Sequence, residues 1–243
     1  MNRKTPFVNN EHYHLYNRGI DKRNIFSNQK DINRFFQSMI EFNGIDPIGS
    51  IYEKTYFPKH HNTFGGETSK KSKSKKYDVK TNKNKLIDFV AYCLNLNHYH
   101  FIVRQVMDRG IEKFMHRLAT GYTMYFNEKE KRSGSLFQGV FKSVHINTDE
   151  YLLHLSAYVN LNDRVHNFGG FGGETSKIVK SISSWGEYMA KGNGESENGI
   201  CDKRIILDQF RNVLEYKKYA LESLKFTRKK KKELKEARDL LLE

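Results

Sequence analysis

Residues 86–104 decide the fold, and they read LIDFVAYCLNLNHYHFIVR. Within this stretch, residues 86–95 and residues 98–104 each show the alternation of a strand that has one face buried. Only Asn95-Leu96-Asn97 connects the two runs. Because so short a connection joins neighbouring strands, the stretch predicts an antiparallel strand pair.

The sequence on either side of this pair predicts further strands and helices. A short aromatic strand is expected at 13–17, and an extended segment with a bend at Gly139 is expected at 136–146. Apolar residues at helical spacing predict helices at 29–43, 109–130 and 149–162. Thr148 is placed to cap the last of these helices. This mixture favours an α+β domain whose antiparallel sheet carries helices on one face.

The composition excludes several classes of protein. The 243 residues include 17 Phe, 14 Tyr and one Trp, which is too much apolar material for a disordered chain. Two cysteines, Cys93 and Cys201, are too few for a disulfide scaffold. The chain has no run of about 18 apolar residues, and its first residues do not form an apolar signal core. We therefore expect a cytoplasmic protein.

The net charge of +14 is concentrated in two segments. Residues 54–85 hold ten Lys against two acidic residues, and residues 201–243 hold thirteen Lys or Arg against eight acidic residues. A polyanionic partner, most often nucleic acid, is one explanation of such runs. A solvated, solubilising surface is the other explanation.

The heptad Phe-Gly-Gly-Glu-Thr-Ser-Lys occurs twice, at residues 64–70 and 171–177. Its period and its context do not fit a solenoid repeat. The heptad can be encoded by an inverted repeat centred on the Glu codon, so one hypothesis is that a short DNA palindrome entered the gene twice. A peptide duplication or a coincidence is the alternative, and the codons of the gene distinguish the two explanations.

His98 and His100 are the sharpest candidates for a chemical role. Residues two apart on a strand point to the same face, so the two imidazoles would project together. Side by side they form half of a site for a divalent metal ion. Two hydrogen-bonded surface histidines are the alternative interpretation.

Tyr158 and Asn162 are four residues apart, so they share one face of the predicted helix 149–162. The Asn162 amide oxygen could complete a site made of two histidines and one amide. Tyr158 would then lie one helical turn from the metal, where its phenol could attack a phosphodiester that the metal polarises. A core or boundary tyrosine is the alternative interpretation.

Five ordered blocks of the sequence resemble the IS200-like, single-tyrosine HUH transposases. The resemblance is closest to the branch associated with repetitive extragenic palindromes (REP). The blocks are YHLYNRG at 13–19, NHYHF at 97–101, YFN at 125–127 with SGSLFQG at 133–139, YVNLN at 158–162, and SSW at 183–185. Together they extend over about residues 12–190, with an interruption at 59–85.

The resemblance implies a ferredoxin-like sheet with a Mg²⁺ or Mn²⁺ site. His98 and His100 would be metal ligands, and Asn162 would take the place of the family's third, amide-bearing ligand. Tyr158 would attack single-stranded DNA that bears a hairpin and form a 5′-phosphotyrosine link, which a 3′-hydroxyl later attacks to rejoin strands. The implied function is DNA transposition and recombination. A protein that binds hairpin DNA or RNA without cleaving it is the alternative.

The resemblance also divides the chain. Residues 1–190 would form the catalytic domain with a basic insertion at about 59–85, residues 191–199 a linker, and residues 200–243 a basic helical tail. The candidate nucleic-acid-binding residues in this tail are Arg228, Lys229, Lys230, Lys231 and Lys232.

Two positions depart from the family pattern. Val140 stands where a basic residue is usual, and Asp163 stands where a proline is usual. Both departures bear on the choice of substrate. Monomers and homodimers are both compatible with the family.

Overall fold

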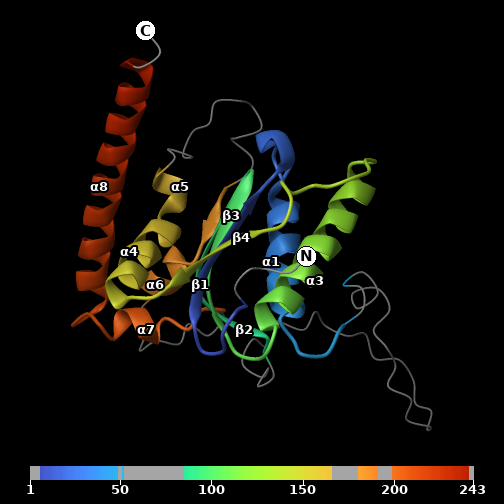
Figure 1. Cartoon of the computed structure of the whole chain (residues 1–243), viewed down its shortest axis with the longest axis horizontal. Coiled ribbons are helices and arrows are strands. Elements are labelled where there is room, and N and C mark those ends of the chain that lie inside the picture. The colour runs from blue at the N-terminus through green and yellow to red at the C-terminus, as the bar shows by residue number, and fades with distance from the viewer. Residues whose placement is uncertain (1–5, 49–50, 52–84, 166–179, 191–198, 241–243) are drawn as a thin grey trace.

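A five-stranded antiparallel sheet in the order β4-β1-β3-β2-β5 forms the centre of the molecule (Figure 1). The computed structural model describes residues 6–48, 51, 85–165, 180–190 and 199–240. The first elements are β1 (His12–Arg18), η1 (Ile20–Lys22), α1 (Gln29–Glu41), β2 (Ile87–Asn95), β3 (His98–Gln105), α3 (Gly110–Lys129) and β4 (Lys142–Ile146). This β-α-β-β-α-β succession, with β1 and β3 adjacent in the middle, is ferredoxin-like. The predicted α+β class with an antiparallel sheet is confirmed.

The remaining elements follow β4 along the chain. They are α4 (Asp149–Asn160), α5 (Asn162–Val165), β5 (Ile182–Ser183), α6 (Trp185–Met189), α7 (Arg204–Leu207) and α8 (Val213–Leu240). Thr148 caps α4 as predicted, because its side-chain oxygen accepts a hydrogen bond from the Tyr151 backbone at 3.2 Å. Within the described part of the chain, no helix has the length and apolar character needed to cross a membrane.

The predicted strand pair forms β2 and β3, with Asn95 opposite His98 and Cys93 opposite His100. The alternation of β3 separates two environments. Tyr99 and its alternate neighbours lie in one buried cluster, whereas Ile102, on the face of the two histidines, belongs to the other cluster. The hairpin therefore fixes which layer of the protein the histidines face.

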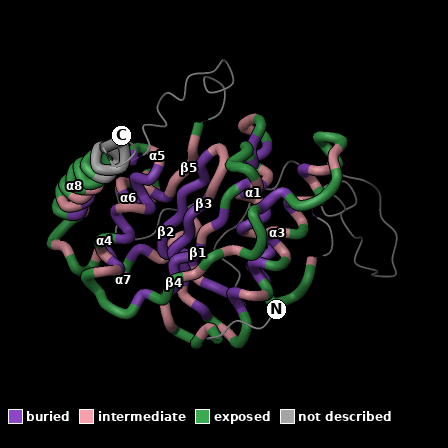
Figure 2. The backbone as a smooth tube through the Cα atoms, turned by 45° about the horizontal axis from the view of Figure 1, so that its top comes forward, coloured by how far each residue is buried: buried purple, intermediate pink, exposed green. Residues whose placement is uncertain are grey.

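Helices cover both faces of the sheet, not one face as the sequence predicted (Figure 1). α1 and α3 close one face over a cluster that includes Phe35, Phe101 and Phe114. α4, α6 and α8 close the other face over a second cluster. The buried positions run along the sheet and the sides of the helices turned toward it (Figure 2). An apolar helix stripe specifies that a face is buried but does not specify which side of the sheet it covers.

Strand β4 is shorter than the extended segment expected at 136–146. Leu136 and Phe137 are buried ahead of the strand, and the chain then turns at Gly139, whose φ is 70°. A glycine adopts this positive φ without the steric cost that a side chain would add. The predicted bend is therefore present, and the strand begins only after it.

The segment after residue 199, expected as a basic helical tail, is helical, but its first half is packed onto the protein. Tyr216 of α8 is fully buried, and its hydroxyl accepts a hydrogen bond from the Asn160 amide at 2.9 Å. Ser184 donates to the Asn160 side-chain oxygen at 2.6 Å, and Ser183 donates to the Asn160 backbone carbonyl at 2.9 Å. The C-terminal end of α4 is therefore held by α8 and by the residues around β5.

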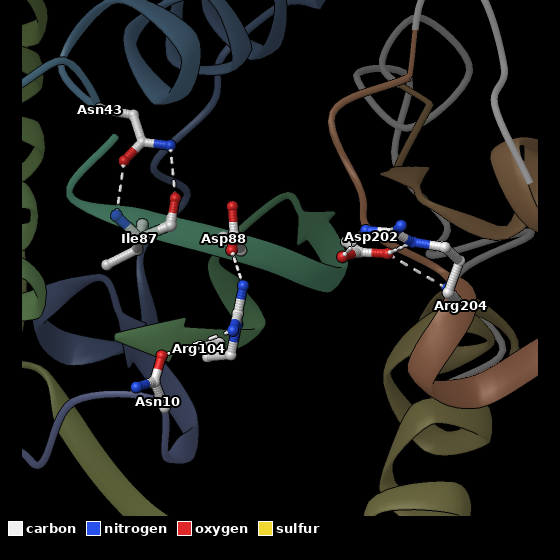
Figure 3. A network of polar contacts seen from close by, with 7 residues as sticks. All are labelled: Asn10, Asn43, Ile87, Asp88, Arg104, Asp202 and Arg204. Carbon is white, nitrogen blue, oxygen red and sulfur yellow. Dashed lines mark hydrogen bonds and ion pairs between the residues drawn. The ribbon is translucent and has the colours of Figure 1, made fainter. Parts of the chain in front are cut away.

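A second polar network lies at the start of β2 and the end of β3 (Figure 3). The Asn43 side chain bonds to the backbone N–H and carbonyl of Ile87 at 3.0 and 2.9 Å. Asp88 and Arg104 form a cross-strand ion pair at 2.5 Å. These contacts fix the end of the sheet that lies away from His98 and His100.

Several features expected from the sequence lie outside the described residues. They are nearly all of the basic insertion at 59–85, with His60-His61, both copies of the heptad, and nearly all of the linker at 191–199.

Candidate active site

Strand β3 carries His98 and His100 on the sheet face that α4 covers. α4 carries Tyr158, and Asn162 opens the short helix α5 directly after it. The imidazole of His98 lies 3.2 Å from the Asn162 side-chain oxygen, measured from Nε2 to Oδ1. The rings of His100 and Tyr158 meet edge to face with 5.7 Å between their centroids. The four residues that the sequence singled out are therefore neighbours in space.

The hydrogen bonds around His98 assign its proton. Its Nδ1 lies 2.6 Å from the side-chain oxygen of Asn97. Asn97 in turn donates from its amide nitrogen to the Lys22 carbonyl at 3.2 Å, which fixes the orientation of the amide. Because a side-chain carbonyl oxygen only accepts, Nδ1 of His98 must carry the hydrogen. Nε2 of His98 is then the ring atom that can bind a cation.

The amide of Asn95 links His98 to Asn162. Its nitrogen lies 3.0 Å from His98 Nε2 and 2.8 Å from Asn162 Oδ1. One amide nitrogen has two hydrogens, so it can donate to both atoms. A group with partial positive charge therefore already bridges the two atoms that the sequence predicts as metal ligands.

His100 is held through Nδ1 as well. This atom lies 2.9 Å from Nε2 of His14 on β1, and both residues are buried. Burial lowers the pKa of His14 to about 4, so the His14 ring is neutral near pH 7. Tyr16, two residues further along β1, stacks on His14 and His100 with centroid distances of 5.0 and 5.7 Å.

Tyr158 has a protonated phenol at neutral pH. Burial raises its pKa above the ordinary value, and the nearby Asn162 side chain opposes part of this rise. Asn162 is fully buried, and its side-chain nitrogen has no hydrogen-bond partner. A buried polar atom of this kind is unusual in a stable core and is more typical of a functional site.

The donor set fits a divalent ion. Two imidazoles and one amide oxygen suit an ion that accepts both nitrogen and oxygen ligands. Mn²⁺ accepts nitrogen ligands more readily than Mg²⁺ does. Within the described ranges, no group of three His, Cys, Asp or Glu residues could hold a metal. The Asn162 side-chain oxygen, 3.2 Å from His98 Nε2, is a further oxygen donor beside the pair of histidines.

A cavity of about 410 Å³ opens beside the two histidines. Its lining residues, all described, include no acidic side chain; they are Tyr16, Asn17, Arg18, Lys22, Asn97, His98, His100, Gln138 and Lys142. Arg18 hydrogen-bonds to the Gln138 side chain across the opening. Three uncompensated positive charges give the cavity a preference for anions.

Helix α8 adds positive charge from the other side of the site. Arg228 donates to the Arg164 carbonyl at 2.6 Å, just after α4 and Asn162. Lys231, one turn further, contributes to lowering the pKa of His98, although burial is the larger cause. Partial burial also lowers the pKa of Lys231. Part of the basic run in the sequence therefore contributes to the electrostatic field at His98, although Lys231 itself is exposed.

Sequence reasoning did not assign a role to His14, Asn95 or Tyr16. His14 and Tyr16 lie in the first resembling block, but only the pairing of β1 with β3 brings them to His100. His154 lies on the same helix as Tyr158, yet it bonds to Ser223 of α8 at 3.1 Å. No local sequence signal indicates these contacts, because each depends on strand register or on helix packing.

Comparisons with known proteins agree with the sequence motifs. Residues 52–162 match the model of a family described as "Transposase IS200 like", and this stretch holds His98, His100, Tyr158 and Asn162. The match begins later in the chain than the motif at 13–19. None of the curated proteins matches the chain.

A solved structure described as "Structure of the REP associates tyrosine transposase bound to a REP hairpin" aligns with 84% of this chain and 93% of that chain. The identity is 12% and the TM-score is 0.42, values at which the likeness supports no conclusion. The family match is the informative comparison: residues 52–162, somewhat under half of the chain, are similar to the IS200-like transposases.

Proposed function

We propose that this protein is an IS200-like transposase that cleaves and rejoins single-stranded DNA through a covalent bond to Tyr158, with a divalent metal ion held by His98, His100 and Asn162. The observation that carries the proposal is the meeting of these four side chains from β3, α4 and α5 beside a cationic cavity. A nucleophile, a metal-binding group and an anion-binding surface are the parts that phosphodiester cleavage requires.

In the proposed reaction, the phenolic oxygen of Tyr158 attacks the scissile phosphorus. A bond from Tyr158 to phosphorus forms, and the bond from phosphorus to the 3′-oxygen breaks. The phenol loses its proton to solvent, and the departing 3′-oxygen takes one up. When bound, Mg²⁺ or Mn²⁺ would polarise the phosphate oxygens and stabilise the charge that develops on them. The 5′-phosphotyrosine link keeps the energy of the phosphodiester for rejoining.

The substrate that we propose is DNA with a hairpin beside the cleaved single strand. The hairpin follows from the resemblance of the sequence blocks to the REP-associated branch. The cationic cavity and the α8 residues Arg228, Lys229, Lys230, Lys231 and Lys232 would contact the backbone, which dominates affinity for nucleic acid. The exposed part of the Tyr16 ring would offer a surface for an unpaired base.

The test uses labelled single-stranded hairpin DNA from the flanks of the gene, incubated with the protein and Mn²⁺ and separated on a denaturing gel. We expect label to stay attached to the wild-type protein and to vanish with Tyr158→Phe, while DNA binding persists. Tyr151→Phe, on the same helix, is the matched control and should form the adduct normally.

Two results would contradict the proposal. An adduct formed by Tyr158→Phe would mean that another tyrosine attacks, and Tyr16 would be examined first because it stacks on His100. Tyr122 would not be examined, because it is fully buried and bonds to the Ile25 carbonyl at 2.7 Å. Tight binding without any adduct would favour a non-cleaving hairpin-binding protein.

A further inference from the structure

The two histidines of the site are held in the same way. In each ring, Nδ1 lies within hydrogen-bond distance of a neighbouring side chain, Asn97 for His98 and His14 for His100. Partners of this kind orient metal-binding histidines in many proteins, because they fix which ring nitrogen carries the hydrogen. The partner of His98 is an amide oxygen, whereas the partner of His100 is a second imidazole.

The bond between His14 and His100 permits two arrangements. In one arrangement, His100 donates from Nδ1 to a bare Nε2 on His14, and Nε2 of His100 is free of hydrogen. In the other, His14 donates to His100, and a neutral His100 then carries its hydrogen on Nε2, where it blocks coordination. Only in the first arrangement can a neutral His100 bind a metal ion through Nε2.

We infer that His14 is a positioning residue, which accepts the Nδ1 hydrogen of His100 and so directs the Nε2 lone pair of His100 toward the metal. The inference rests on the proposed function for the presence of the metal. The arrangement at His98 supports it, because Asn97 imposes the same tautomer there. Both rings then present Nε2 to the site.

The packing holds His14 in this position. Its side chain is 7% exposed, and its ring is stacked on Tyr16 and His100 with centroid distances of 5.0 and 5.2 Å. On the sheet, His14 is opposite Ile102, and Tyr16 is opposite His100, so His14 reaches His100 diagonally. The ring cannot turn away without unstacking from both neighbours.

The first test measures the tautomer directly, in metal-free protein without DNA. Long-range ¹H–¹⁵N spectra of histidine-labelled protein at pH 7.5 should show His100 with hydrogen on Nδ1, its signals assigned by their loss in His100→Gln. A hydrogen on Nε2 of His100 would overturn the inference. This measurement needs neither metal binding nor cleavage, so it stays decisive even if the proposed function fails.

The second test measures Mn²⁺ affinity by electron paramagnetic resonance. His14→Phe keeps a stacking ring but has no acceptor, and we expect affinity to fall by about 10–100-fold. His14→Gln retains an acceptor oxygen near the position of Nε2 and should lose much less. His12→Phe is the matched control on the same strand face and should bind as wild type does.

Unchanged Mn²⁺ affinity in a folded His14→Phe protein would overturn the inference, as would an equal loss in His12→Phe. If His14→Phe does not fold, the wild-type tautomer and the affinity of His14→Gln decide the question. If the wild-type protein binds no Mn²⁺ at all, the proposed metal role fails, and the spectra alone test the bond between His14 and His100.

Discussion

Two cavities of nearly equal size open on the same face of the sheet, at opposite ends of β1 and β3. One, of about 410 Å³, contains His98 and His100, and we call it the histidine cavity. The other, of about 430 Å³, is lined by residues that include His12 and the Asp88–Arg104 pair, and we call it the ion-pair cavity. Figure 3 shows the Asp88–Arg104 and Asp202–Arg204 pairs. Volume alone does not distinguish them.

The charges distinguish the two cavities. In the ion-pair cavity, Arg104 bonds to Asp88 at 2.5 Å and Arg204 bonds to Asp202 at 2.8 Å, and Asp208 adds a further negative charge. The histidine cavity has cations without acids among its lining residues. An ion pair cancels its own field, whereas uncompensated cations attract a polyanion. The comparison teaches that charge compensation, and not size, separates the ion-pair cavity from the cavity that we propose for nucleic acid.

The largest expected effect comes from removing a metal ligand in the histidine cavity. His100→Ala should lower Mn²⁺-dependent cleavage by at least about 100-fold, because the metal stabilises charge by several kcal/mol. Single-turnover cleavage with and without chelator measures this effect. His12→Ala, in the ion-pair cavity, should cleave at the wild-type rate. Cleavage by His100→Ala that persists in chelator would remove the metal from the proposal.

A smaller effect is expected from neutralising cations of the histidine cavity. Lys22→Gln with Lys142→Gln should weaken binding of single-stranded DNA and flatten its salt dependence. The slope should fall by roughly 0.7 for each phosphate that the protein no longer neutralises. Fluorescence anisotropy at several salt concentrations gives this slope.

Arg104→Gln is the matched change in the ion-pair cavity. It should leave the salt slope unchanged and lower the free energy of unfolding by less than about 1 kcal/mol, since the pair is partly exposed. Equal changes of slope in the two cavities would contradict the distinction between them.

The smallest effect is expected at α8. Lys231→Gln should slow single-turnover cleavage by about threefold, the size expected for one partly exposed charge. Lys229, two residues away, lies 4.0 Å from Glu233. Lys229→Gln changes the net charge of the protein equally; it should weaken DNA binding but should not slow single-turnover cleavage when the DNA is saturating. A similar cleavage rate for the two variants would indicate that this part of α8 is only a solvated surface.

Features that depend on local sequence could be predicted. The alternation in residues 86–104 predicts the β2–β3 pair, and the two-residue spacing of His98 and His100 predicts that they share a face. The four-residue spacing of Tyr158 and Asn162 likewise predicts one side of a helix. The first two follow from the geometry of a single element. The predicted helix 149–162 is interrupted, because α4 ends at Asn160 and Asn162 begins α5, yet the four-residue spacing still brings Tyr158 and Asn162 together.

Features that depend on contacts between distant segments could not be predicted. His14 meets His100 only through the register of β1 on β3, and the field of Lys231 reaches His98 only because α8 packs beside α4 and α5. The layer of helices on the second face was missed for the same reason. A basic run in a sequence does not indicate which of its residues will face a site.

The hold on the end of α4 has a mechanical consequence for the proposed reaction. Asn160, two residues after Tyr158, is tied to Tyr216, Ser183 and Ser184. The end of α4 that carries Tyr158 could move away from the sheet only if these bonds and the buried contacts of Tyr216 were broken together. The backbone at Tyr158 is therefore held in a fixed position. Between cleavage and rejoining in the proposed reaction, the phosphate bound to Tyr158 therefore stays in place, and the DNA end that carries the 3′-hydroxyl is the part that moves.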